Sequence, residues 1–251
     1  MTFLRKLSAR NWIVGLGAVL AVAALPASTR ADFKVTFGVG FDMVAVVDNG
    51  AGDLNSAVGS ISISQTINQV SFEIIANSNR TDLSGGLPQI QDSTVHIMNS
   101  GQTAQRAQIA MTDTGFTLSG SAGTAATLQS QLGISSLGGV NTRVTGSFNS
   151  YVDNSNTEFG MAIGTASQRL LFPLPPEDQL KEKDFLMGDV FSLTNVFNLV
   201  LPAQQRNGAA FTGTTLVASA PEPSSALLVG MALPTLAIAG CYFGRQRRRT
   251  R

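Results

Sequence analysis

One histidine and one cysteine limit the chemistry that this chain of 251 residues can carry out. A nucleophile usually needs a base that is held by a third group, and histidine is the usual base. His96 lies in the run TVHIM, on the face opposite Val95 and Ile97, which predicts an exposed strand histidine rather than a catalytic one. A zinc site would need three carboxylates around this single imidazole, so we expect neither a metal nor another cofactor.

Two carboxylates can support glycosidase chemistry when they flank the bond to be cleaved. The candidates are Glu73, Glu158 and a cluster of Glu177, Asp178, Glu182 and Asp184. The cluster alternates with lysines, which is typical of a solvated loop, and Glu73 falls on the solvent face of an alternating strand. No spacing favours a pair, so we predict that the protein is not an enzyme. A hydrolase with an unrecognised carboxylate pair is the rival hypothesis.

The segment DNGAGDLN offers several oxygens to a hard cation such as calcium, with Asp48, Asp53 and Asn55 as candidate ligands. It lacks the spacing and the closing glutamate of a helix-loop-helix calcium site. Asp-Asn-Gly is also a preferred sequence for tight turns. We therefore predict a turn without metal, and a calcium loop is the alternative.

The charge of the chain is unevenly distributed. Residues 32–220 contain 8 Lys or Arg and 15 Asp or Glu, a net charge of −7, whereas the whole chain carries +1. Binding to nucleic acid requires Lys and Arg that displace counterions from phosphates. An acidic body without a basic stripe therefore argues against a nucleic-acid partner.

Short alternating runs separated by Gly, Asn, Asp and Ser follow one another through residues 32–219. The first, FKVTFGVGF, places Phe33, Val35, Phe37, Val39 and Phe41 on one face. Such runs, without amphipathic helices between them, predict an all-β antiparallel β-sandwich of about 9 to 11 strands in one domain.

Two segments are harder to assign. Residues 189–201 fit the period of a strand and that of a short helix. Residues 171–185 contain three prolines followed by alternating charges, which predicts a long loop that ends in a helical turn.

The N-terminus has the three-part layout of a secretory signal peptide. Basic residues precede an apolar run from Trp12 to Leu25, which Pro26 and small residues follow. This run is shorter than the roughly 20 residues that a membrane-spanning helix needs. We therefore expect signal peptidase to remove residues 1–31 by cleavage between Ala31 and Asp32.

The C-terminus predicts a single transmembrane helix at about residues 225–243. Residues 226–243 are uncharged, include the only cysteine, and would extend about 27 Å as a helix, close to the hydrocarbon thickness of about 30 Å. Five arginines follow and should remain cytoplasmic: Arg245, Arg247, Arg248, Arg249 and Arg251. The acidic body would then lie outside the membrane.

Pro221, Glu222 and Pro223 immediately precede this apolar segment and its arginine tail. The ordered triplet, span and basic tail in residues 220–251 resemble the PEP-CTERM sorting signal of Gram-negative bacteria. The resemblance implies that exosortase, a membrane enzyme, cuts near Pro-Glu-Pro and releases the body to the cell surface or extracellular matrix, after an intermediate at the inner membrane. It also implies an association with exopolysaccharide.

The sequence as a whole predicts a non-enzymatic surface or matrix protein. The alternative is a calcium-dependent carbohydrate-binding or adhesive module that the C-terminal helix anchors permanently. Without the signal peptide the chain has no Trp, and Tyr151 is the one tyrosine of the body. Sugar-binding sites commonly present aromatic faces, so this composition weighs against a typical lectin groove.

Overall fold

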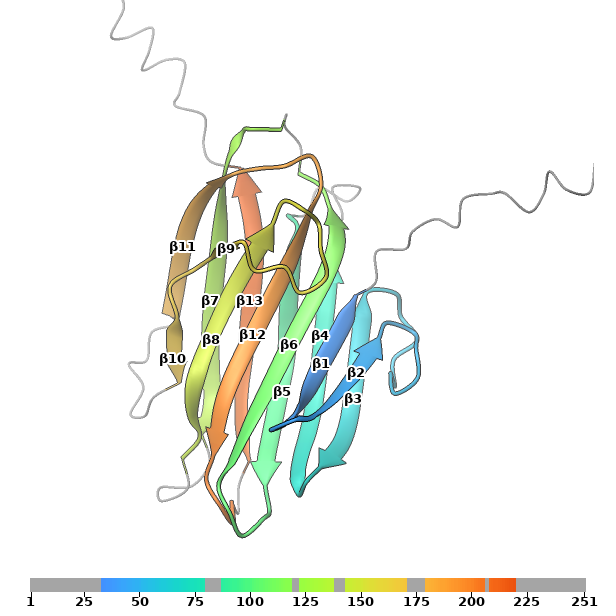
Figure 1. Ribbon diagram of the computed structural model, residues 1–251, viewed down its shortest axis with the longest axis vertical. Coiled ribbons are helices and arrows are strands. Elements are labelled where there is room, and N and C mark those ends of the chain that lie inside the picture. Colours follow the sequence, from blue (N-terminus) through green and yellow to red (C-terminus); the bar gives the residue numbers. More distant parts are fainter. Residues whose placement is uncertain are drawn as a thin grey trace, which may run out of the picture. The chain divides into compact units, whose positions relative to one another are not determined.

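Strands form the regular structure of every segment that can be described in the computed structural model, namely residues 33–79, 87–118, 122–137, 143–170, 179–205 and 208–219. In these segments the strands make two antiparallel sheets and there is no helix (Figure 1). The predicted all-β class and antiparallel pairing are thus confirmed. Residues 1–31 and 220–251, with the expected helix at 225–243, lie outside the described residues.

The sheet that faces the reader in Figure 1, here called the front sheet, has the strand order β10-β8-β12-β6-β1-β2, and β9 pairs with β8. Its strands are β1 (Lys34–Val39), β2 (Asp42–Val47), β6 (Gln105–Phe116), β8 (Thr145–Asp153), β9 (Ile163–Gly164), β10 (Gln168–Leu170) and β12 (Phe191–Leu201).

The back sheet has the order β11-β7-β13-β5-β4-β3. Its strands are β3 (Ser60–Ile67), β4 (Val70–Asn79), β5 (Gln89–Asn99), β7 (Ala125–Leu137), β11 (Gln179–Leu186) and β13 (Ala209–Ser219). The described residues therefore hold thirteen strands, two more than the upper end of the expected range, because β9 and β10 span only 2 and 3 residues.

Phenylalanine dominates the core between the sheets. Among the residues described above, eight rings are fully buried: Phe33, Phe37, Phe72, Phe116, Phe148, Phe191, Phe197 and Phe211. Phe197 of the front sheet lies 4.5 Å from Phe148 and 4.9 Å from Phe211 of the back sheet, measured between ring centroids. Alternation along each strand sends these rings inward, and aromatic pairs at this distance add to the stabilisation that burial gives.

The hairpin of β1 and β2 shows where simple alternation fails. Phe33 to Val39 alternate into the core as predicted, but Phe41 is fully exposed, so its predicted place on the core face was wrong. Val39 pairs with Asp42, which leaves Gly40 and Phe41 as a two-residue turn. Gly40 has a φ of 62°, as the first central residue of a type II′ turn requires. Phe41 is the second central residue, so it belongs to the turn and not to the strand.

The charged segment at 171–185 was predicted as a loop ending in a helical turn, and this was wrong for its second half. Residues 179–186 form β11, the edge strand that pairs with β7. Gln129 of β7 donates to Glu182 at 2.9 Å, and Thr127 donates to Asp184 at 2.8 Å. An edge strand has one side open to water, so it tolerates a charge pattern that a central strand would not.

The ambiguous segment at 189–201 is a strand from Phe191 onward. β12 lies between β6 and β8 and pairs with both. The alternation of apolar and polar residues breaks in the middle of the strand, where the inward residue Asn195 is polar and the outward residue Val196 is apolar, and both are buried. A strand could therefore not be identified from the sequence alone.

Candidate functional site

The histidine and the strand glutamate considered above form a cross-strand pair on the outer face of the back sheet. His96 Nδ1 lies 3.4 Å from Glu73 Oε2, and the two side chains are 38% and 66% exposed. The predicted solvent-facing positions of both residues are confirmed. Exposed pairs of this kind contribute little to stability, and an open sheet surface does not shield a base or its substrate from water.

The other candidate carboxylates that can be placed lie on different sheets. Glu158 pairs with Lys34 at 2.5 Å, beside the front sheet, whereas Glu182 and Asp184 lie on the exposed edge strand β11 of the back sheet. Glu177 and Asp178 are outside the described residues. The carboxylate candidates that can be placed therefore do not converge on one cleft.

The carboxylate oxygens of Asp48 and Asp53 already accept hydrogen bonds from backbone N–H groups of the loop and of the residues that follow it. Asp53 Oδ1 accepts from the backbone N–H of Asn55 at 2.9 Å and of Ser62 at 3.0 Å, and its Oδ2 accepts from Asn49 N–H at 2.9 Å. Asp48 Oδ2 accepts from the N–H of Gly59 at 2.8 Å. Among the residues that the structure describes, no group of three or more His, Cys, Asp or Glu side chains is placed to hold a metal.

We predict that replacing Asp53 with alanine lowers the free energy of unfolding by about 1 to 3 kcal/mol, because three backbone donors lose their acceptor. Millimolar calcium should leave the melting temperature of the wild-type chain unchanged. Thermal unfolding with and without calcium checks both statements, with Asp189→Ala as the control, since Asp189 is exposed. A calcium-dependent rise in melting temperature that Asp53→Ala abolishes would establish a calcium loop instead.

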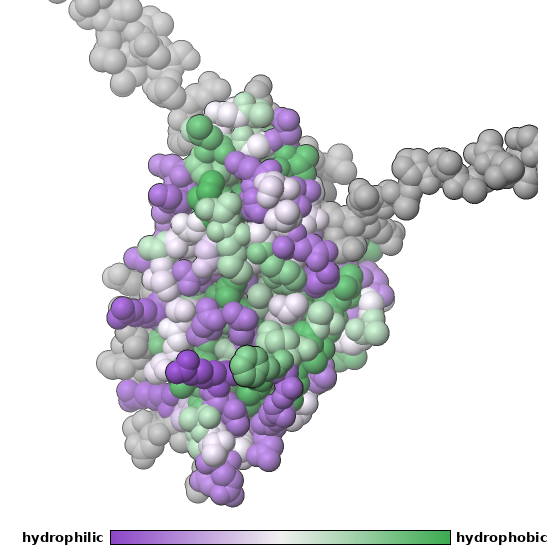
Figure 2. All heavy atoms as spheres, viewed as in Figure 1, coloured by the Kyte–Doolittle hydropathy of each residue, from purple (hydrophilic) through white to green (hydrophobic). Residues whose placement is uncertain are grey.

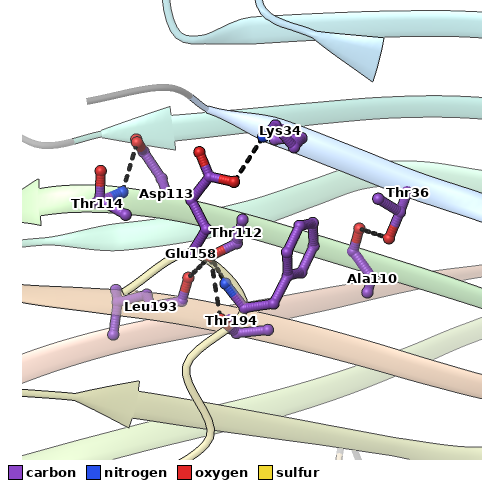
Figure 3. A network of polar contacts seen from close by, with 10 residues as sticks. Lys34, Thr36, Ala110, Thr112, Asp113, Thr114, Glu158, Leu193 and Thr194 are labelled. Carbon is purple, nitrogen blue, oxygen red and sulfur yellow. Dashed lines mark hydrogen bonds and ion pairs between the residues drawn. The ribbon is translucent and has the colours of Figure 1, made fainter. Parts of the chain in front are cut away.

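The loop that connects β8 and β9 covers one part of the outer face of the front sheet (Figure 3). The N–H of Phe159 donates to Thr112 Oγ1 at 3.1 Å, and Thr112 Oγ1 donates to the carbonyl of Leu193 at 3.2 Å. Lys34 and Glu158 form their ion pair beside it. Thr112 and Thr194 are fully buried beneath this cover, although both face away from the core.

Asp153 holds this loop in its conformation. The Ser155 hydroxyl at 2.7 Å, the Thr157 hydroxyl at 2.5 Å and the Ser155 N–H at 2.9 Å all donate to its carboxylate, and they lower the pKa of Asp153 below its ordinary value despite the opposing effect of burial. A lowered pKa means that ionised Asp153 stabilises the fold at neutral pH. This contribution is lost as the pH falls through the lowered pKa.

Elsewhere the outer face of the front sheet is open and holds a groove of about 370 Å³. The groove is lined by Gly40, Phe41, Arg106, Ala107, Gln108, Asn198, Leu199 and Val200. Figure 2 shows this face, where apolar and hydrophilic side chains lie next to one another. The turn between β1 and β2 joins the groove because the N–H of Gly40 donates to the carbonyl of Arg106 at 3.0 Å.

Strand register places the polar side chains of the groove together. Asn198 of β12 pairs with Gln108 of β6, and Val200 pairs with Arg106, so the four side chains share one face of the sheet. Gln108 Nε2 donates to Asn198 Oδ1 at 3.0 Å, which fixes the two amides next to each other. Each amide keeps further donor or acceptor capacity for a ligand.

An exposed ring, two amides and a guanidinium can bind a polar ligand that also has an apolar face. A sugar ring is such a ligand, since its C–H face can pack on an aromatic side chain while its hydroxyls bond to amides. None of the described residues that line the groove is a carboxylate. This arrangement can bind, but its lining supplies no acid and base pair for hydrolysis.

Sequence reasoning missed this groove because it assigned Phe41 to the core. A usable signal was present: only Gly-Phe separates two alternating runs, which matches the Gly-X of a two-residue type II′ hairpin.

A second polar cluster lies inside the sandwich, between the sheets. Ser150 Oγ donates to Ser130 Oγ at 2.8 Å, and Thr215 donates to the side-chain oxygen of Asn195. All four residues are fully buried, so a ligand would reach them only if the sheets opened. We assign the cluster a structural role.

No family model and no curated protein matches this chain. Among solved structures, the enzymatically active domain of tailspike protein 4 from bacteriophage CBA120 is 11% identical with a TM-score of 0.29, and the match covers 68% of this chain and 21% of that one. A mannan-recognising carbohydrate-binding module is 9% identical with a TM-score of 0.25, over 61% of this chain and 85% of that one. Function must therefore be inferred from this chain's own residues.

Proposed function

We propose that this chain is an exported, non-enzymatic surface or matrix protein that binds polysaccharide in the groove of the front sheet. The observation that carries the proposal is the fully exposed ring of Phe41 beside the bonded amide pair of Gln108 and Asn198. Eight other phenylalanines of the described segments are fully buried, so a phenylalanine exposed to water at the edge of a groove is an exception among them.

The sequences of the N-terminus and the C-terminus favour an extracellular site of action for the protein. The signal-like N-terminus would direct the body out of the cytoplasm through signal peptidase. The Pro221 to Pro223 triplet, the apolar segment and the arginine tail would hold it at the inner membrane until exosortase processes it. An exported protein of a Gram-negative bacterium that is then released to the surface meets exopolysaccharide there, which is the ligand class that the groove chemistry suits.

Replacing Phe41 with alanine should weaken binding to exopolysaccharide purified from the same cells by about tenfold, because the aromatic contact of the groove is lost. Affinity electrophoresis or calorimetry with the full-length chain in mild detergent measures this. Leu180→Ala is the matched control, since Leu180 is an exposed apolar residue on β11 of the back sheet.

Two outcomes would contradict the proposal. Either the wild-type chain does not bind the polysaccharide, or Phe41→Ala and Leu180→Ala bind as tightly as the wild type. Binding that requires calcium would instead favour the alternative of a calcium-dependent, permanently anchored adhesive module that uses Asp48, Asp53 and Asn55.

A further inference from the structure

We infer that the groove selects acidic polysaccharides and that Arg106 is the residue that recognises their carboxylates. The inference rests on the proposed function and adds the charge class of the ligand. The wall of the groove contains an arginine, and recognition of a neutral sugar does not require a charged side chain.

Arg106 is exposed and is available to a ligand. Among the residues that the structure describes, none provides an ion-pair or hydrogen-bond partner for its guanidinium. The residue across from it on β12 is Val200, which cannot neutralise it. A guanidinium presents a planar fork of donors that matches a carboxylate with two parallel hydrogen bonds.

The acidic residue that is nearest to Phe41 in the sequence makes its hydrogen bond outside the groove. Asp42 follows Phe41, but its Oδ2 accepts a hydrogen bond from Asn68 at 2.6 Å, in the turn between β3 and β4 of the back sheet. Lys34 and Glu158 neutralise each other at the covered part of the front sheet. Arg106 is therefore the charged side chain of the groove lining, on a body whose net charge is −7.

The register extends the polar surface away from Phe41 across the front sheet. Asn198 pairs with Ser147 of β8, and Ser147 pairs with Arg169 of β10, an exposed residue. Since neighbouring strands lie about 4.8 Å apart, Arg169 is about 14 Å from the position of Gln108. A polymer laid across the strands would thus meet Phe41 and Arg106 first, then the amide pair, and then a second arginine.

The test compares polygalacturonate, a polymer of a uronic acid, with the same polymer after its carboxyl groups are reduced to alcohols. The full-length chain in mild detergent should bind the acidic polymer about tenfold more tightly than the reduced one. Arg106→Gln should weaken binding of the acidic polymer by about tenfold and leave binding of the reduced polymer nearly unchanged. The melting temperature of the variant reports whether it still folds.

Lys181→Gln is the matched control because it removes the same charge from β11 of the back sheet. Equal weakening by Lys181→Gln and Arg106→Gln would mean that net charge alone matters, and would overturn the inference. Equal binding of the two polymers, or binding of native exopolysaccharide without any binding of polygalacturonate, would also overturn it while the proposed function stands. Absence of binding to all three polymers would remove the proposed function and this inference together.

Discussion

Replacing Phe197 with alanine should lower the free energy of unfolding by about 3 to 5 kcal/mol, which is a large part of the stability of a single domain. Phe197 is fully buried on the central strand β12, and its ring contacts Phe148 in its own sheet and Phe211 in the other. Its removal leaves a cavity where the two sheets meet, and the surrounding strands can close that cavity only in part. Chemical denaturation of the wild type and the variant measures the difference.

Phe41→Ala is the internal control for that experiment, because it is the same substitution at a fully exposed ring. It should change stability by less than about 0.5 kcal/mol. Together the two variants separate the two roles of phenylalanine in this chain: Phe197→Ala should affect folding, and Phe41→Ala should affect binding. Similar stability losses for both would mean that the Phe41 ring packs against the protein in solution.

The second large effect concerns processing of the chain. In its native cells the mature protein should begin near Asp32 and end near Pro223, and the C-terminal cut should require the sorting enzyme. The expected reason is that prolines on both sides of Glu222 favour an extended backbone by their fixed φ, and an extended segment is the form that a protease engages. Intact mass and C-terminal peptide mapping of protein from cells with and without the enzyme test this.

A double variant that combines Pro221→Ala with Pro223→Ala and keeps the arginine tail should lose the cut, which would assign recognition to the triplet. Pro202→Ala, a change to a proline of the body, serves as the control and should leave the cut intact. A protein that retains Arg251 in cells with and without the enzyme would be a permanent single-span membrane protein, and the sorting proposal would fail.

The fold class could be predicted from the sequence because alternation is a local property. Each of the runs beginning at Phe33, Ser60 and Val70 has apolar residues at every second position over much of its length, and each forms a strand. Strand β12 could not be separated from a helix, because polar Asn195 on its inward face and apolar Val196 and Val200 on its outward face interrupt the alternation. Strand β11 was missed because its charged sequence resembles a loop. The strand forms by pairing with β7, which is distant in sequence, and this pairing cannot be read from the residues of β11 alone.

The candidate groove could be predicted only in part. The type II′ turn that exposes Phe41 has a local signal in Gly40, but the meeting of Gln108 with Asn198 depends on pairing between strands 90 positions apart. No periodicity within either strand reveals which residue it will face. The negative expectations about catalysis, by contrast, follow directly from residue types, and they stay predictions that activity assays can test.

The charged edge strand β11 has a consequence for how densely copies of this protein can be packed. A second chain that added its own strand to this edge would have to remove water from Lys181, Glu182, Lys183 and Asp184. The cost of removing this water opposes edge-to-edge pairing between copies on this side, so the charges of β11 disfavour the growth of fibrils through this edge.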